Sequence, residues 1–321
     1  MAHGSHFLLS AKARTLSLKT VFQMGDDKAY ETFRRMRWHL TDGAAVCPRC
    51  GCTETYDIAT RRRFKCVACY HQFSVTSGTI FASRKLSFTD LLAAIVIFVN
   101  GAKGIAALQL SRDLDVQYKT AFVLSHKLRE AMALEQQGRM LNGIVEIDGA
   151  YFGGYVKPEN RKEDRKDRRL LENRSGKRQC VVIMRERGGR SLPFIVRHEG
   201  DAVPLVRDHV GTLTTIHADE GTGWDDLHAG WDMKRVNHSV SFKDEGACTN
   251  QAESYFSRLR RMEVGTHHHI AGKYLGSYAR EASWREDNRR AHNGKQAALV
   301  GFAAMASGVS RQWAGYWQRA A

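Results

Sequence analysis

Two pairs of closely spaced cysteines restrict the first third of the chain more than any other feature. Cys47 and Cys50 form the motif CPRC, and Cys66 and Cys69 form the motif CVAC. Four thiolates at these spacings fit a zinc ribbon, in which two tight turns place the ligands as a tetrahedron around Zn²⁺. We expect a structural Zn²⁺ that supports folding and takes no part in chemistry.

Other uses of these cysteines fit less well. A thioredoxin-like redox site has one CxxC beside a βαβ unit, and none is visible here. The N-terminal stretch MAHGSHFLLSAKARTLSL lacks the long apolar segment of a secretory signal, so we expect a cytoplasmic setting that disfavours disulfides. Cys52 has a poorer spacing than the four ligands, and Cys180 and Cys248 resemble small core residues.

The charge balance indicates a polyanionic partner. Lys and Arg number 49 against 34 for Asp and Glu, which gives a formal net charge of +15. Such an excess favours nucleic acid, and hence a nucleoid-associated protein. A merely soluble basic surface is the alternative. No run of about 18 apolar residues is present, so we expect no membrane partner.

Helical periodicity dominates up to about residue 138. We expect a helix over 26–40 and another that begins after Ser87 and stops at Gly101. A helix, a turn near 113–115 and a longer helix from about Val116 then outline a helix-turn-helix. Two core helices with solvated basic faces are the alternative. The second helix would present a polar set to a DNA groove: Gln117, Lys119, Thr120, His126, Lys127 and Arg129.

Strands replace helices in the second half. We expect a strand in GIVEIDGAYFGG, a hairpin joined at Gly188-Gly189, a strand in TTIHADE and a short one in MKRVNHSV. Short helical patterns lie in AVPLVRDHV and TNQAESYFSRLRRM. The basic stretch 157–178 has no apolar periodicity and reads as an exposed loop, whose Lys157, Arg161 and Lys162 would contact DNA phosphates.

Acidic residues mark the ends of these elements, which is unusual in so basic a chain. Asp148 lies on the first strand, Asp219 ends TTIHADE, and Glu253 lies on the last of these helices. A sheet with the first and fourth strands side by side would bring the two aspartates together. Asn250, Glu253, Ser257 and Arg260 share one helix face, which would carry Glu253 to them.

Three converging carboxylates suit one chemistry in particular. Their oxygens are hard ligands for Mg²⁺ or Mn²⁺, and two such ions can activate the attacking oxygen and stabilise the leaving oxygen of a phosphodiester. The alternative for any single acid is a solvated or ion-paired surface carboxylate, and we assign Glu146, Glu220, Asp225 and Asp226 to that class.

At this level the chain resembles the zinc-ribbon DDE transposases of bacterial insertion sequences, the ISXO-like group. The likeness runs over most of the length, through RRMRWHLTDGAAVCPRCG, HQFSVTSGTIFASRKLSF, KGIAALQLSRDLDVQYKTAF, VEIDGAYFGG, IHADEG and TNQAESYFSRLRR. It implies an RNase H-like mixed-sheet catalytic domain with Asp148 and Asp219 as its first two acids. Both Asn250 and Glu253 match the third position, and Arg260, seven residues on, favours Glu253.

The resemblance also implies an organisation and a function. We expect an N-terminal helix and zinc ribbon over 1–82, a helix-turn-helix region over 83–138 and the catalytic domain over 139–321. The expected protein binds the terminal inverted repeats of an insertion sequence and catalyses metal-dependent DNA cleavage and strand transfer, as a homodimer when two DNA ends are paired. The rivals are a non-catalytic DNA-binding regulator, and an RNase H-like nuclease that cleaves without joining.

Overall fold

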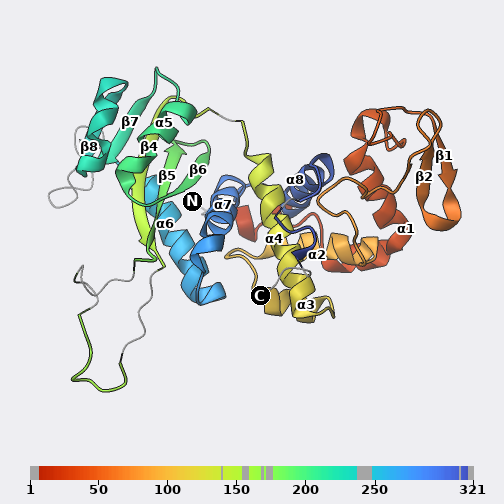
Figure 1. Ribbon diagram of the computed structural model, residues 1–321, viewed down its shortest axis with the longest axis horizontal. Coiled ribbons are helices and arrows are strands. Elements are labelled where there is room, and N and C mark those ends of the chain that lie inside the picture. The colour runs from red at the N-terminus through yellow and green to blue at the C-terminus, as the bar shows by residue number, and fades with distance from the viewer. Residues whose placement is uncertain are drawn as a thin grey trace, which may run out of the picture. The chain divides into compact units, whose positions relative to one another are not determined.

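The computed structural model describes residues 7–138, 140–153, 159–167, 170, 176–236, 248–310 and 312–316. The chain forms two compact units. The first joins the residues up to 137 with those from 288 onward, and the second comprises residues 138–287 (Figure 1).

The first unit packs helices beside a small sheet. Its helices are α1 (Leu18–Arg37), α2 (Phe88–Asn100), α3 (Ala107–Asp113), α4 (Tyr118–Glu135) and α8 (Asn293–Ala306). Three antiparallel strands follow α1: β1 (Thr55–Ile58), β2 (Arg63–Cys66) and β3 (Gln72–Phe73). Phe33 of α1 meets Phe81 edge-on and packs against Phe88 with tilted rings, and Trp38 meets Phe64 and Phe73 edge-on. Aromatic packing therefore holds the small sheet to α1 and α1 to α2.

Local signals explain most of these helix ends. Ser87 accepts a hydrogen bond from the backbone N–H of Asp90 and caps α2, which stops before Gly101 as predicted. Asp115 adopts a positive φ of 48° between α3 and α4, which confirms the predicted turn. The helix expected over 26–40 begins earlier, at Leu18, and ends at Arg37. Gly25, with φ 72°, bends it, a break that apolar periodicity alone did not reveal.

The second unit is a five-stranded mixed sheet with helices on both faces. Its strands are β4 (Ile144–Phe152), β5 (Gln179–Glu186), β6 (Ser191–Val196), β7 (Thr215–Asp219) and β8 (Asp232–Val236). Their order in the sheet is β6-β5-β4-β7-β8. β4 and β6 are antiparallel to β5, whereas β7 is parallel to both β4 and β8. The predicted fold class, a zinc ribbon followed by an RNase H-like mixed sheet, is confirmed.

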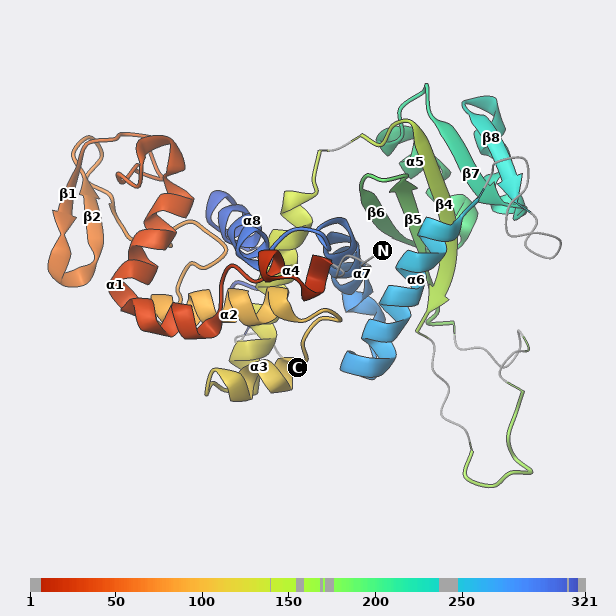
Figure 2. The same ribbon diagram turned by 180° about the vertical axis from the view of Figure 1, so that it is seen from behind.

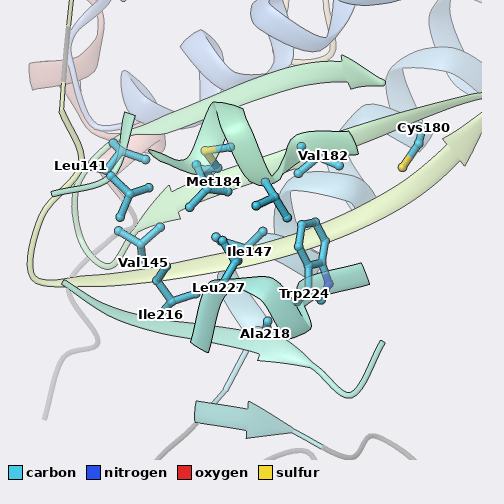
Figure 3. Packing of buried hydrophobic residues seen from close by; sticks show 14 residues of the cluster. Leu141, Val145, Ile147, Cys180, Val182, Met184, Ile216, Ala218, Trp224 and Leu227 are labelled. Carbon is cyan, nitrogen blue, oxygen red and sulfur yellow. The ribbon is translucent and has the colours of Figure 1, made fainter. Parts of the chain in front are cut away.

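Two apolar clusters cover the two faces of this sheet. One joins strand residues such as Ile147 and Ala218 to α5 (Val203–His209) and to the 3₁₀ segment η7 (Thr222–Ala229). Figure 3 shows the Trp224 ring of η7 beside Ile147 in this cluster. The other cluster joins Ala150, Ile183 and their neighbours to α6 (Asn250–Met262) and α7 (Gly272–Asp287). In Figure 2, α6 lies along β4.

The sheet unit is shorter than the catalytic span expected over 139–321. It ends at Asp287, and α8 lies in the first unit, where it contacts α1, α2 and α4. Val300 and Ala304 of α8 are fully buried, which explains the difference, since their apolar face is covered by those helices.

Candidate active site

The four predicted zinc ligands come together in the first unit. The Sγ atoms of Cys47, Cys50, Cys66 and Cys69 all lie within 4.8 Å of one another. Gly51 and Tyr70 follow the two pairs with positive φ values of 76° and 57°, as the tight turns require. A hydrogen bond from the backbone N–H of Cys69 helps to lower the pKa of Cys66 to about 6, which favours its thiolate. The thiols form a closed site for a structural Zn²⁺.

The second unit brings Asp148 and Asp219 to adjacent strands. The parallel register pairs Val145 with Ile216 and Glu146 with His217. Both aspartates lie two residues beyond this last pair, so each is carried to the same edge of the sheet. The predicted adjacency of the first and fourth strands of this unit is confirmed.

Asp219 is held by two donors that bind the same oxygen. The backbone N–H of Gly221 donates to Oδ1 over 3.1 Å, and the Trp224 indole N–H donates to it over 3.0 Å. Trp224 is fully buried in the cluster of Figure 3, so its ring cannot swing away. Oδ2 has no hydrogen-bond partner among the described residues. This leaves one oxygen of a fixed carboxylate for a ligand.

The surroundings of Asp148 disfavour its ionised form. Burial raises the pKa of this carboxyl to about 7, although the backbone N–H of Gly149 acts in the opposite direction, and the charges of Asp219, Glu199 and Glu253 raise it further. Burial and the charge of Asp219 also raise the pKa of Glu199. Neighbouring acids that raise the pKa of Asp148 and of Glu199 fit a divalent cation, whose charge reverses this effect.

Glu253 lies on α6 and is exposed, as are Asn250 and Arg260 on the same helix. The influence of Glu253 on Asp148 places its charge within electrostatic reach, but the three acids do not form a tight cage. Within the described ranges, only the four cysteines make a group of three or more ligands this close together. The candidate acidic site is therefore open, because Glu253 on α6 is exposed and its carboxylate is not grouped closely with those of Asp148 and Asp219.

A buried network joins the three elements that carry these acids. Glu146 of β4 is fully buried and accepts hydrogen bonds from the backbone N–H groups of Gln251 and Ala252, at the start of α6. Arg187 forms a 3.1 Å ion pair with Glu146 and lies 3.1 Å from Nδ1 of His217 on β7. Burial, reinforced by the Arg187 charge, lowers the pKa of His217, which keeps its ring neutral.

The assignment of Glu146 to the surface is thus wrong. Its carboxylate is desolvated, compensated by Arg187 and two backbone donors, and ties β4 to α6 two residues before Asp148. Cys248, expected in the core, is partly exposed and belongs to the same network, since its backbone N–H donates to His217 over 3.1 Å.

The residues predicted to contact DNA differ in how exposed their side chains are. Gln117, Lys119 and Thr120 are exposed at the start of α4, and Arg161 and Lys162 are exposed in the basic stretch. Lys127 is half-buried, and burial lowers its pKa. Lys157 lies outside the described residues.

Two members of the predicted recognition face are not available to a groove. Arg129 is 2% exposed, with its guanidinium over the Phe98 ring of α2. His126 is 1% exposed and stacks on Trp313. Both residues lie on the side of α4 that packs against the rest of the first unit. This side is polar in sequence, but the packing makes it internal.

Comparison with protein families agrees with this architecture. Residues 24–72 match the transposase zinc-ribbon domain, and residues 140–287 match the ISXO2-like transposase domain. Together these ranges cover more than half of the chain, which belongs to the zinc-ribbon DDE transposases. Its catalytic-domain match places it in the ISXO2-like group of that family. No curated protein matches the chain significantly. No described helix is long and apolar enough to cross a membrane.

Proposed function

We propose that this transposase binds the terminal inverted repeats of an insertion sequence and catalyses metal-dependent DNA cleavage followed by strand transfer. The observation that carries the proposal is the β4–β7 register, which brings Asp148 and Asp219 to one edge of the sheet while α6 supplies Glu253. The residues fit a hard divalent cation, because all the donors are carboxylate oxygens and Oδ2 of Asp219 is left for a ligand.

The acids have distinct roles in this proposal. Asp148 and Asp219 hold Mg²⁺ or Mn²⁺ from adjacent strands, and Glu253 completes the set when α6 and DNA are in place. When bound, the ions supply charge stabilisation at the attacking and leaving oxygens of the phosphodiester. Arg260, exposed on the same helix, orients Glu253 or contacts a phosphate. Asn250 is the alternative third residue on the same helix.

Two phosphoryl transfers would follow one another at this site. Hydrolysis at the end of the element frees a 3′-hydroxyl, and that hydroxyl then attacks a phosphodiester of the target DNA. No covalent bond to the protein is needed. A homodimer that pairs two ends would carry out both reactions on both ends.

The first unit supplies the DNA contacts in this proposal. The N-terminal turn of α4 presents Lys119 and backbone N–H groups, a favourable site for a phosphate. Arg61 and Arg63 are exposed on the zinc ribbon. Binding should weaken steeply with salt, because phosphate contacts release counterions.

Strand transfer of a labelled, pre-cut end of the element into a plasmid with Mg²⁺ tests the proposal. Asp148→Ala and Asp219→Ala should abolish joining without loss of end binding, and whichever of Glu253→Ala and Asn250→Ala also does so identifies the third ligand. Binding by the wild-type protein without cutting or joining would instead support the regulator. Cutting without joining, and without preference for the ends, would support the nuclease.

A further inference from the structure

The first turn of α6 is capped by a residue of the sheet rather than by its own N-cap residue. The side chain of Thr249, at the N-cap position, accepts no capping hydrogen bond from the described residues of α6. Oε2 of Glu146 on β4 accepts these bonds instead, over 2.7 Å from the backbone N–H of Gln251 and over 3.2 Å from that of Ala252. The start of the helix is therefore fixed to the strand that carries Asp148.

The neighbouring strands hold the segment that enters α6 as well. The backbone N–H of Cys248 donates to Nδ1 of His217 on β7 over 3.1 Å. Arg187, directly after β5, donates to the carbonyl oxygen of Cys248 over 3.4 Å. Arg185 of β5 donates to the carbonyl oxygen of Gln251 over 3.2 Å. Contacts from β4, β5 and β7 thus fix this segment from three directions.

The anchors on β4 and β7 lie one row behind the two aspartates. The parallel register pairs Glu146 with His217. Side chains alternate along a strand, so Glu146 and Asp148 point to the same face of the sheet. Ala150, next in this alternation, packs in the cluster that contains α6, which lies along this face of β4 (Figure 2). The neighbours of His217 on β7 pack on the opposite face. The helix is therefore anchored to the row of side chains next to that of Asp148 and Asp219.

The anchored backbone lies between the two candidates for the third catalytic residue. Asn250 precedes Gln251, and Glu253 follows Ala252. A shift of the first turn of α6 along the sheet would move both candidates relative to Asp148. Whichever of them acts, its position depends on the contacts of this turn with the sheet.

Packing alone does not require such a network. Apolar residues of α6 such as Tyr255 and Leu259 are fully buried in the cluster with the sheet and α7, which already holds the helix in place. A buried ion pair is often no more stabilising than apolar residues of similar size. Apolar burial has no preferred direction, whereas hydrogen bonds depend on distance and angle. What the network adds is therefore the exact position of the first turn.

We propose that Glu146 and His217 are positioning residues, which place the third catalytic residue of α6 against Asp148 and Asp219. The inference rests on the proposed function, because it concerns the same acidic site. In this role neither residue touches DNA or a metal ion. Glu146 acts through two backbone N–H groups of α6, and His217 acts through that of Cys248.

Strand-transfer rates at saturating DNA test this role with two pairs of variants. Glu146→Leu and His217→Leu remove the acceptors for the backbone of α6 and of Cys248. They should slow joining by about tenfold or more, since misplacement of a reacting group by about 1 Å can cost about a hundredfold. Glu146→Gln and His217→Asn keep a carbonyl oxygen near each acceptor position and should recover most of the rate. Affinity for the DNA end should stay the same in all four variants.

Arg258→Met is the matched control on the same helix. The Arg258 guanidinium forms a 2.6 Å ion pair with Glu286 of α7, so its loss weakens the packing of α6 but leaves the contacts with Glu146 in place. It should lower the temperature of thermal unfolding without slowing joining. Amide hydrogen exchange at Gln251 and Ala252 gives a readout that does not depend on activity. Exchange there should be faster in Glu146→Leu and unchanged in Arg258→Met.

The outcomes separate this inference from the proposed function. If the wild type joins and the folded Leu variants join at the same rate, the positioning role is overturned and the acidic site stands without it. Equal losses in Arg258→Met, or in the Gln and Asn variants, also overturn it, because altered packing or charge then explains them. If the wild type neither cuts nor joins, the proposed function fails, and the positioning role fails with it. The His217 pair decides the matter if Glu146→Leu does not fold.

Discussion

The zinc ribbon and the acidic site hold their charged ligands in opposite ways. The four thiols of the ribbon come from two short turns and lie within 4.8 Å of one another. The proposed acidic ligands Asp148, Asp219 and Glu253 come from β4, β7 and α6, and Glu253 is exposed. A closed site of this kind stabilises a fold, whereas an open one leaves coordination positions for a substrate. The two sites should therefore respond to mutation in different ways.

Loss of a ribbon ligand should have the largest effect on stability. Cys66→Ser removes one of four thiolates, and structural zinc contributes about 10 kcal/mol of apparent binding free energy to folding. We expect zinc content to fall and residues 47–73 to become protease-sensitive, while the sheet unit still unfolds cooperatively. Cys52→Ser is the matched control, since Cys52 lies outside the cluster, and it should retain zinc. Normal zinc content in Cys66→Ser would contradict the assignment.

The two sites also differ in how far the sequence predicts them. The ribbon follows from spacing alone, because each CxxC turn is a local structure. The closeness of Asp148 and Asp219 depends on the order of the strands, and the parallel β4–β7 pairing confirms the predicted adjacency. Glu199 has no local signal of this kind, because its effect on the pKa of Asp148 arises between segments that are far apart in sequence.

The remaining errors have one physical cause. Whether a polar side chain is internal depends on what packs over it, and a helix or strand pattern does not contain that information. The sequence predicts Glu146 as a surface acid, but Arg187 and the start of α6 cover it. The sequence predicts that Arg129 faces DNA, but its guanidinium lies over the Phe98 ring. Fully buried charged side chains are rare, so a sequence pattern alone favours the surface for both residues.

The network behind the acids should be the next most sensitive point. Arg187→Met leaves the fully buried Glu146 without its cation, and we expect a loss of about 3–5 kcal/mol in the free energy of unfolding. Glu146→Gln combined with Arg187→Met should recover part of this loss, because no unpaired charge remains. Urea unfolding of the single and double variants measures the difference. Equal stability of all the variants would show that the network does not hold α6 to β4.

The open site should also leave a signature in the dependence of stability on pH. The pKa of Asp148 is raised to about 7, so between its unfolded value near 4 and pH 7 the folded protein binds more protons than the unfolded chain. Stability of the protein without added Mg²⁺ should therefore fall as pH rises through this window. Asp148→Asn should remove the dependence and stabilise the protein by about 1–3 kcal/mol at pH 8. Thermal unfolding from pH 5 to 8 measures this, and a wild-type stability that rises over the range would contradict it.

The smallest effect is expected from a substitution that changes only the hydrogen bond orienting the Asp219 carboxylate. Trp224→Phe removes the indole donor from Oδ1 of Asp219 and should cost about 1 kcal/mol of stability and about tenfold in strand transfer. Trp231→Phe is the matched control, because its indole donates over 2.9 Å to the carbonyl oxygen of Gly211 rather than to an acid. We expect a comparable loss of stability there with unchanged strand transfer. If both variants lose transfer equally, the effect is one of packing, and the Trp224 hydrogen bond does not orient Asp219.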